Sequence, residues 1–236
     1  LLESRGIRPA AFLVDTIISS SGVVSPPPGY LRRVAEIVNE SGALFIADEV
    51  QPGFGRTGRN FWGFEADAFT PDIVTMGKPM GNGHPLAAVV AKSDLVDAFS
   101  SRSHYFNTFG GNPVSAAAGL AVLDEIEEKE LQQNALGIGQ LLLDGLHDLA
   151  TRHDCIGDVR GTGFFLAVEL VEDRETRNPD KDRAHRVVND LREHGVLTGS
   201  IGPDNNILKL RPPMVLSAAD ANFLIETLDE SISRTA

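Results

Sequence analysis

The chain has 236 residues, 42% of them hydrophobic, which is enough to bury a sizeable core and argues against disorder. Its formal net charge of −12 argues against nucleic acid or an anionic membrane as a main partner. No apolar run approaches the roughly 20 residues that cross a bilayer. The single cysteine, Cys155, excludes an internal disulfide, so the predicted compartment is a reducing cytoplasm.

Four short apolar runs in the first part of the chain predict strands of one sheet, buried on both faces. They are 11–14, 43–47, 72–75 and 86–91. Between the first two runs, apolar residues at helical spacing predict a helix over 29–40, and Gly42 is its expected stop. The stretch 48–72 is long enough to cross over to a parallel strand, and its Gly, Pro and aromatic content predicts mostly loop.

The rest of the chain predicts helices first and then a smaller mixed domain. An alanine-rich helix is expected from Asn112 and Pro113 to Glu128, and a second helix follows over 130–150. The later expectations are a strand at 164–170, a helix at 182–193, a strand at 206–211 and a final helix at 217–233. We therefore predict an α/β chain with two domains: 1–128, part of a large domain with a mainly parallel sheet, and 129–236, a small C-terminal α+β domain.

Asp48 and Lys78 carry the clearest functional signal in the sequence. Asp48 ends one predicted strand, and Lys78 follows another in a loop rich in glycine and proline. Because the carboxyl ends of parallel strands meet at one edge of a sheet, where such sheets bind ligands, we expect the two side chains to lie close together. A lysine beside bare backbone can form an imine with a carbonyl group, and a carboxylate can hold a protonated pyridine nitrogen. The pair predicts a site for pyridoxal 5'-phosphate, with Glu49 and Gln51 at the same edge.

Each of these residues also has an ordinary structural explanation. Asp48 could cap a turn, Lys78 could be a solvated surface lysine, and Thr108 could contact a phosphate or simply belong to a helix-entry loop. The string from Gly53 to Gly58 fits the G-x-G-x-x-G pattern of dinucleotide-binding proteins, but no amphipathic helix follows it, which argues against a nicotinamide site. The six histidines show no spacing typical of a metal site, so we expect no catalytic metal.

Three motifs together resemble a known family. The sequence FIADEVQPGFGRTG at 45–58, PDIVTMGK at 71–78 and FNTFGGNPVS at 106–115 resemble the class III aminotransferases, which are fold type I pyridoxal-phosphate enzymes. Within that family they are most similar to the subgroup of ethanolamine-phosphate phospho-lyases and alanine-glyoxylate-aminotransferase-2-like enzymes. The resemblance covers only about the C-terminal half of a family member, so we expect the chain to be a piece of a longer polypeptide.

The resemblance implies a role for each matching residue. Lys78 would hold the cofactor as the internal aldimine and shuttle a proton, and Asp48 would pair with the pyridine nitrogen. Val50 would pack on the ring, and Gln51 would lie near the 3-oxygen of the cofactor. Thr108 would reach the cofactor phosphate of the neighbouring subunit, which implies a homodimer.

Two departures from the family pattern leave the reaction open. Lys209 stands where many members that bind a substrate carboxylate have an arginine, and Asp15 stands where its glutamate partner is frequent; both are predicted to bind substrate. The first reading is amino transfer from a primary amine to a keto acid. Because a lysine serves a phosphate at least as well as a carboxylate, phosphate elimination from an amine such as ethanolamine phosphate is the alternative. A third is a non-catalytic fragment or dimerisation module, since no N-terminal phosphate cup precedes Leu1.

Overall fold

The computed structural model describes residues 2–235, which form two compact units. The first unit comprises the residues up to Thr16 together with Pro26–Phe54 and Trp62–Lys129. The second comprises Ile17–Ser25, Gly55–Phe61 and the residues from Glu130 onward. Among the described helices, none combines the length and the hydropathy needed to span a membrane.

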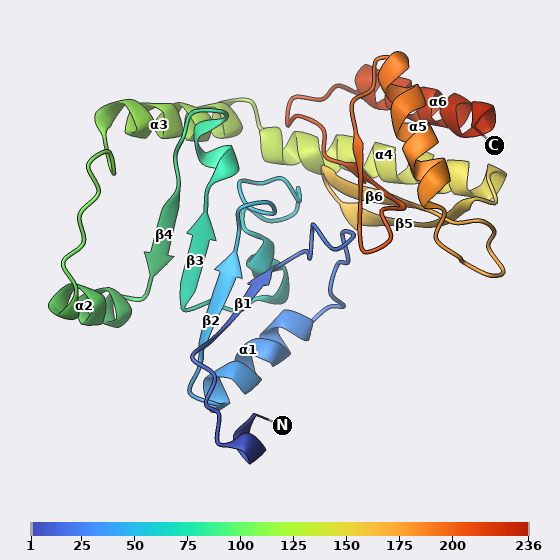
Figure 1. The fold of residues 1–236 in the computed structure, drawn as a ribbon. Coiled ribbons are helices and arrows are strands. Elements are labelled where there is room, and N and C mark those ends of the chain that lie inside the picture. The colour runs from blue at the N-terminus through green and yellow to red at the C-terminus, as the bar shows by residue number, and fades with distance from the viewer. Residues whose placement is uncertain (1, 236) are drawn as a thin grey trace. The chain divides into compact units, whose positions relative to one another are not determined.

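The first unit is built on a four-stranded sheet, the first sheet, with the order β1-β2-β3-β4 (Figure 1). Its strands are β1 Ala11–Asp15, β2 Leu44–Asp48, β3 Ile73–Met76 and β4 Ala88–Ala91. The first three strands are parallel, and β4 runs antiparallel to β3. The prediction that the four apolar runs form one sheet is confirmed, but the expectation that they are buried on both faces is wrong, because Leu13 on β1 is 59% and Val89 on β4 66% exposed.

Helix α1, Tyr30–Glu40, forms where the apolar spacing predicts it. Leu31, Ala35 and Val38 line its buried side and pack with the buried residues of β2, among them Phe45. The start of α1 is capped from outside the helix, because the carboxylate of Asp67 accepts hydrogen bonds from the backbone N–H groups of Gly29 and Leu31, both at 2.7 Å. Asp67 ends the short 3-10 helix η2, Gly63–Asp67, which lies in the segment after β2. This segment therefore also fixes the start of α1, the helix before β2.

Two further helices and two 3-10 turns complete the first unit. The turns are η1, Glu3–Arg5, and η3, Lys78–Gly81. Helix α3, Pro113–Glu128, has Pro113 at its first position and Asn112 as its N-cap, as the sequence indicates. Helix α2, Ser93–Arg102, has no counterpart among the predicted elements. Each of its ten residues is at least partly exposed, so it lacks the buried stripe by which a helix is recognised in a sequence.

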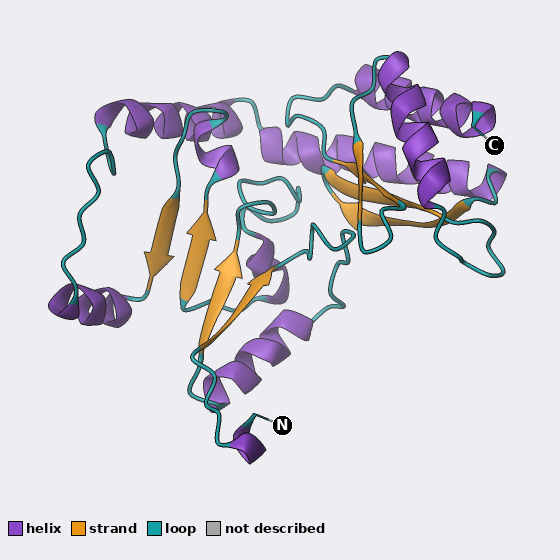
Figure 2. Ribbon diagram, in the orientation of Figure 1, coloured by secondary structure: helices purple, strands orange, loops and turns teal. Residues whose placement is uncertain are grey.

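The second unit contains an antiparallel sheet, the second sheet, with the order β5-β6-β8-β7 (Figure 2). Its strands are β5 Ile156–Thr162, β6 Phe165–Leu170, β7 Gly199–Ile201 and β8 Ile207–Leu210. Its helices are α4 Leu131–Arg152, α5 Lys181–Glu193 and α6 Ala218–Arg234. The helices and strands expected in this region are all present, and Ser217 and Asp220 form the expected capping box at the start of α6.

The short segment Ile17–Ser25 belongs to the second unit through apolar and polar contacts. Ile17 and Val23 are buried in one cluster with Phe165, Ala167 and Ile207. The guanidinium of Arg160 on β5 donates to the backbone carbonyls of Gly22, at 2.7 and 3.0 Å, and Val23, at 3.2 Å. A piece of chain near the N-terminus is thereby tied to a strand more than a hundred residues later.

Candidate functional site

Asp48 and Lys78 emerge at the same edge of the first sheet. Strands β2 and β3 are parallel, and their register pairs Asp48, the last residue of β2, with Thr75. Lys78 is the first residue of η3, two positions after β3 ends at Met76. Figure 1 shows both strands running in the same direction into the loops that carry these residues. The shared edge that the sequence predicts is therefore present.

The Asp48 carboxylate is half-buried and held by a short turn. Its Oδ1 accepts a hydrogen bond from the backbone N–H of Val50 at 3.0 Å, an arrangement typical of an Asx turn. Among residues 2–235, no hydrogen bond or ion pair involves its Oδ2. One oxygen thus fixes the orientation of the carboxylate, and the other is available to a cationic or N–H partner.

Lys78 is exposed and is placed by its neighbours. Its ammonium makes no hydrogen bond or ion pair within the described part of the chain. The preceding Gly77 is buried, and a Cβ placed on it would lie 3.9 Å from Cγ2 of Val50. The turn is closed by the N–H of Met80, which donates to the carbonyl of Gly77 at 2.7 Å. Val50, which follows β2, therefore packs beside Gly77, which follows β3. This contact joins the ends of the two strands.

Helix α3 braces the loop that follows Lys78. Nε2 of His84 lies 2.8 Å from Oγ of Ser115, which is buried in the first turn of α3, and the same hydroxyl donates to the carbonyl of Pro85. Further along α3, a Cβ on Gly119 would lie 2.7 Å from a methyl group of Leu86, so Leu86 packs closely against the helix at this glycine. Sequence reasoning assigned His84 and Ser115 no role, and nothing in their spacing connects them.

The Glu49 side chain is buried among the segments that follow β1 and β2, contrary to the expectation that groups it with Asp48 as a ligand-binding residue. Its side chain is buried, and its carboxylate accepts three hydrogen bonds: from Thr16 Oγ1 at 3.1 Å, from Gly63 N at 2.7 Å and from Phe64 N at 3.0 Å. Successive side chains of a strand point to opposite faces, and Glu49 follows the last strand residue directly. From the sequence alone, this alternation indicates that the side chains of Asp48 and Glu49 lie on opposite faces of the sheet.

Thr108 and Gln51 are placed less directly. Thr108 is exposed in the loop between α2 and α3, where the side-chain oxygen of Asn107 accepts from the backbone N–H groups of Phe109 at 3.1 Å and Gly110 at 3.0 Å. Gln51 is half-buried in the turn after β2. No contact of the structure brings Thr108 to Asp48 or Lys78 within the described residues, so its role stays a prediction.

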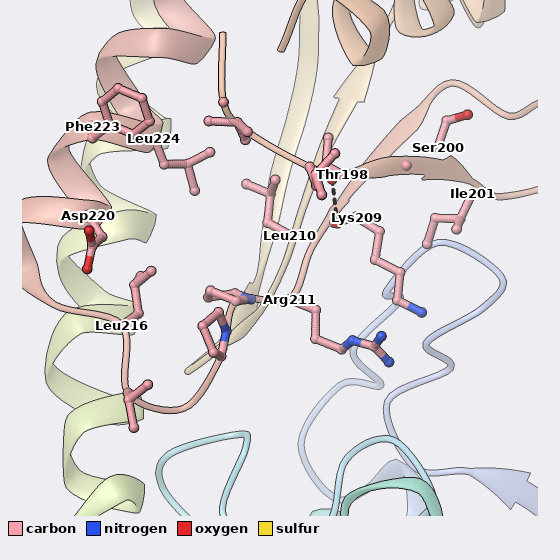
Figure 3. Close-up of a pocket in the computed structure, with 17 residues that line it drawn as sticks. Thr198, Ser200, Ile201, Lys209, Leu210, Arg211, Leu216, Asp220, Phe223 and Leu224 are labelled. Atoms are coloured by element: carbon pink, nitrogen blue, oxygen red, sulfur yellow. Dashed lines mark hydrogen bonds between the residues drawn. The ribbon is translucent and has the colours of Figure 1, made fainter. Parts of the chain in front are cut away.

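Lys209 and Asp15 belong to different units. Lys209 lies on β8, where its Nζ stands 5.1 Å from the centroid of the Phe165 ring. With Arg211 it borders a pocket of about 760 Å³ within the second unit; the hydroxyl of Thr198 donates to the Lys209 carbonyl at 2.8 Å. Figure 3 shows the Lys209 and Arg211 side chains extending to the same side. Asp15 ends β1 in the first unit, in register with Asp48.

The glycine-rich string after β2 is a packing element. A Cβ on Gly58 would lie 2.7 Å from the Cα of Leu136 on α4, and one on Gly163 would lie 2.5 Å from the backbone of Thr57. Arg56 donates to the carbonyl of Pro212 at 2.8 Å and more weakly to that of Phe164 at 3.4 Å. Burial, with a smaller contribution from Arg211, lowers the pKa of the Arg56 guanidinium to about 10. These glycines serve close backbone packing.

The comparison with protein families decides the wider assignment. The model of the family described as aminotransferase class-III matches residues 4–232. The chain belongs to the class-III aminotransferase family. Within this family, it is 48% identical over 95% of its length to a protein from Drosophila melanogaster described as alanine–glyoxylate aminotransferase 2-like. It is 42% identical over 98% of its length to ethanolamine-phosphate phospho-lyase homolog 1 from Caenorhabditis elegans.

Solved structures of class-III aminotransferase relatives share the fold. A phospholyase from Arthrobacter, in complex with phosphoethanolamine, matches 98% of this chain with a TM-score of 0.95 and 42% identity, and the match covers 55% of that protein. An amine transaminase from an uncultivated Pseudomonas species, in its PLP-bound internal aldimine form, matches all of this chain with a TM-score of 0.91 and 34% identity, over 54% of its own length. The expected fold type I architecture is confirmed.

The chain spans about half the length of the curated class-III aminotransferase relatives that it matches. The aligned part is 46% of the Drosophila melanogaster protein and 50% of the Caenorhabditis elegans protein. The resemblance inferred from the three motifs is confirmed over almost the whole chain. The roles of the individual residues remain predictions, because the comparisons identify the family and not the function of each side chain.

Proposed function

We propose that the edge formed by β2 and β3 binds pyridoxal 5'-phosphate, with Lys78 as the covalent attachment point and Asp48 as the partner of the pyridine nitrogen. The observation that supports this proposal is that Asp48, with one oxygen not engaged, ends β2, and that Lys78 follows β3 at the same edge of the sheet, with Val50 beside Gly77. When bound, this cofactor supplies an electron sink for negative charge on the substrate carbon.

The residues present fit the cofactor chemically. A carboxylate with one oxygen already engaged by Val50 N–H offers its second oxygen in a fixed direction, which suits a single ring N–H. An exposed amine without an ion-pair partner is free to condense with an aldehyde. Val50 supplies an apolar surface for one face of a ring, and Gln51 an amide in the same turn. Lys78 would hold the cofactor and, once displaced by the substrate amine, move the proton at the substrate carbon.

Residues 1–128 would then be the C-terminal part of the large cofactor-binding domain, and residues 129–236 the small domain. We also propose a homodimer in which Thr108 contacts the cofactor phosphate held by a second copy. In support, the loop around Thr108 exposes large aromatic side chains: Phe106 is 76% and Phe109 78% exposed. A second copy covering this loop would bury them. The lone cysteine favours the cytoplasm, although the relative from Arabidopsis thaliana is named as mitochondrial.

The substrate is a primary amine, and transfer of its amino group to a keto acid is the first proposed reaction. Elimination of phosphate from a phosphorylated amine is the second, and Lys209 favours it. The ammonium of Lys209 is a point charge beside the Phe165 ring at the border of a pocket, and a phosphate accepts such a charge as well as a carboxylate does. The phospholyase of Arthrobacter with phosphoethanolamine bound supports the same alternative. Asp15, at the end of β1 in the first unit, is also a proposed substrate-binding residue.

Attachment of the cofactor can be tested by borohydride reduction. The complete polypeptide that carries this chain is incubated with pyridoxal phosphate, reduced and mapped by peptide mass spectrometry. We expect the pyridoxyl label on Lys78, its loss in Lys78→Ala, and no change in Lys129→Ala, whose exposed side chain pairs with Glu125. Absence of label at Lys78 in the wild type would instead support a scaffold or dimerisation role.

The two reactions can be separated by their products. Phosphate release from phosphoethanolamine is measured without any keto acid, and amino transfer is measured with pyruvate or glyoxylate as acceptor. Phosphate release that needs no keto acid would reject amino transfer as the main reaction. Lys209→Ala should raise KM for a phosphorylated amine more than for its unphosphorylated counterpart, and equal effects on both would reject a phosphate contact.

A further inference from the structure

The two neighbouring acids at the end of β2 have opposite surroundings. Asp48 is half-buried and holds one oxygen toward the ligand edge, whereas the Glu49 side chain is completely buried, with 0% of its surface exposed. A buried carboxylate is stable only when hydrogen-bond donors replace its hydration. Glu49 meets this condition with neutral donors alone, the hydroxyl of Thr16 and the N–H groups of Gly63 and Phe64.

Glu49 connects every element that surrounds the end of β2. Its side chain reaches Thr16, directly after β1, and the first two residues of η2. Its backbone N–H donates to the carbonyl of Thr75 on β3 at 2.9 Å, which extends the strand pairing beyond Asp48. The approach is so close that a Cβ on Gly63 would lie 2.2 Å from the Thr16 hydroxyl. The position of Asp48 is thus set by the residue that follows it.

We propose that Glu49 is a positioning residue that fixes the Asp48 carboxylate toward the cofactor by joining the ends of β1 and β2 to the start of η2. This inference rests on the proposed role of Asp48. Glu49 touches neither substrate nor cofactor and acts only through the backbone of its neighbour. Any loosening of its three hydrogen bonds would therefore change how Asp48 meets the pyridine nitrogen, while leaving Lys78 in place.

Glu49 also titrates close to neutral pH. Burial raises its pKa to about 7; the hydrogen bonds from Gly63, Phe64 and Thr16 oppose this, and the charge of Asp15 adds to it. The other acids on the surrounding elements are Asp48 of β2 and Glu65 and Asp67 of η2, each already accepting from a backbone N–H group, and β3 carries no titratable side chain. When Glu49 takes up a proton, the Thr16 hydroxyl can turn to accept it, because a hydroxyl both donates and accepts.

The test replaces Glu49 by glutamine in the complete polypeptide. The amide keeps the size of the side chain but places an NH2 group against one of the two backbone N–H groups of Gly63 and Phe64, so one donor loses its acceptor. We expect Glu49→Gln to keep the pyridoxyl label on Lys78, to weaken cofactor binding by about tenfold, and to shift the pH midpoint of the bound-cofactor absorbance. Asp48→Asn should shift that midpoint in the same direction, and Glu65→Gln, an exposed acid on η2, should leave it unchanged.

A second measurement follows the protonation of Glu49 in the absence of the cofactor. Infrared spectra of the cofactor-free protein should contain a protonated-carboxyl band that titrates near pH 7 and is absent in Glu49→Gln. Thr16→Val removes one donor to the ionised form, so the band and the absorbance midpoint should both move to higher pH. If Glu49→Gln does not fold, Thr16→Val decides alone, and an unmoved absorbance midpoint there overturns the inference.

The experiments distinguish a failure of the positioning role of Glu49 from a failure of the proposed cofactor site at Lys78. A Glu49→Gln protein that carries the Lys78 label and titrates like the wild type overturns the positioning role and leaves the proposed function intact. A wild-type protein without label at Lys78 overturns the proposed function, and with it any role of Glu49 toward the cofactor.

Discussion

The two sheets of this chain use their apolar residues differently. In the second sheet, the four residues from Phe165 to Val168 on β6 are all 0% exposed, and α4 buries Leu142, Leu146 and Leu149 to the same degree. In the first sheet, β4 leaves Val89 66% and Val90 56% exposed. The second unit contains a closed core, whereas the first offers strand ends with polar groups and an apolar border. Stability and chemistry should therefore respond to substitution in different places.

The largest expected effect lies at the ligand edge of the first unit. Asp48→Asn removes the charge that stabilises a protonated ring nitrogen, and we expect kcat to fall about 100- to 1000-fold. The free energy of unfolding should change by less than about 0.5 kcal/mol, because the amide oxygen can still accept from Val50. Steady-state kinetics and denaturant titration of the same preparations test both statements. A stability loss as large as that of a core substitution would contradict the contrast between the two units.

The opposite behaviour is expected in the second unit. Leu146→Ala empties a fully buried position on α4, and it should lower the free energy of unfolding by about 3 kcal/mol, with a range of about 2–5. Leu120→Ala, the same change on α3 where the side chain is 61% exposed, should cost less than about 0.5 kcal/mol. Urea unfolding monitored by circular dichroism compares the two. Equal losses would mean that the surface of α3 is already covered in the isolated chain.

Glu49 predicts a pH dependence near neutrality, whereas acids of the second unit such as Asp180 and Asp229 have lowered pKa values, so their contribution changes only at acid pH. Its pKa is about 7 in the folded chain and 4.5 in the unfolded chain, so the folded state binds the proton more tightly. The stabilisation is complete below pH ~4.5 and is lost as the pH rises through 7, which amounts to about 3 kcal/mol. The stability difference between wild type and Glu49→Gln should fall by that amount between pH ~4.5 and ~8. A constant difference would reject the raised pKa.

The smallest effects concern the two N-caps. Ser217→Ala removes the cap of α6 and Asn112→Ala that of α3, and each should cost about 1 kcal/mol. Only Asn112→Ala should also weaken cofactor binding, because Asn112 holds Ser115 and the Ser115 hydroxyl contacts His84 in the loop after Lys78. Isothermal titration with pyridoxal phosphate separates the two variants. Loss of cofactor affinity in Ser217→Ala would argue against a local effect of the α3 cap.

The sequence predicts the parts of the fold that depend on local pattern. The four strands of the first sheet, α1, α3 and the capping box of Ser217 follow from periodicity and cap chemistry. The strand β5 carries Asp158 and Arg160 in place of an apolar run, and its pairing is secured by the ion pair of Arg160 with Glu169, which no local rule reveals. Strand β7 has three residues, too few for any periodicity.

The candidate site likewise has one part that the sequence predicts and another that it does not. The shared edge of Asp48 and Lys78 follows from strand order, so it can be expected from the sequence. The burial of Glu49 depends on Gly63 and Phe64, which return to β2 after a loop, and the His84–Ser115 contact joins residues that are 31 positions apart. Contacts of this kind arise from tertiary packing, and their partners share no motif.

The attachment of Ile17–Ser25 to the second unit has a consequence for synthesis on the ribosome. Gly22 leaves the exit tunnel long before its partner Arg160, which is 138 residues further along the chain. At about 5–20 residues per second, this segment waits on the order of ten seconds with Ile17 and Val23 uncovered. During that interval its apolar side chains lack their native partners, so a chaperone that recognises exposed apolar segments would have access to them.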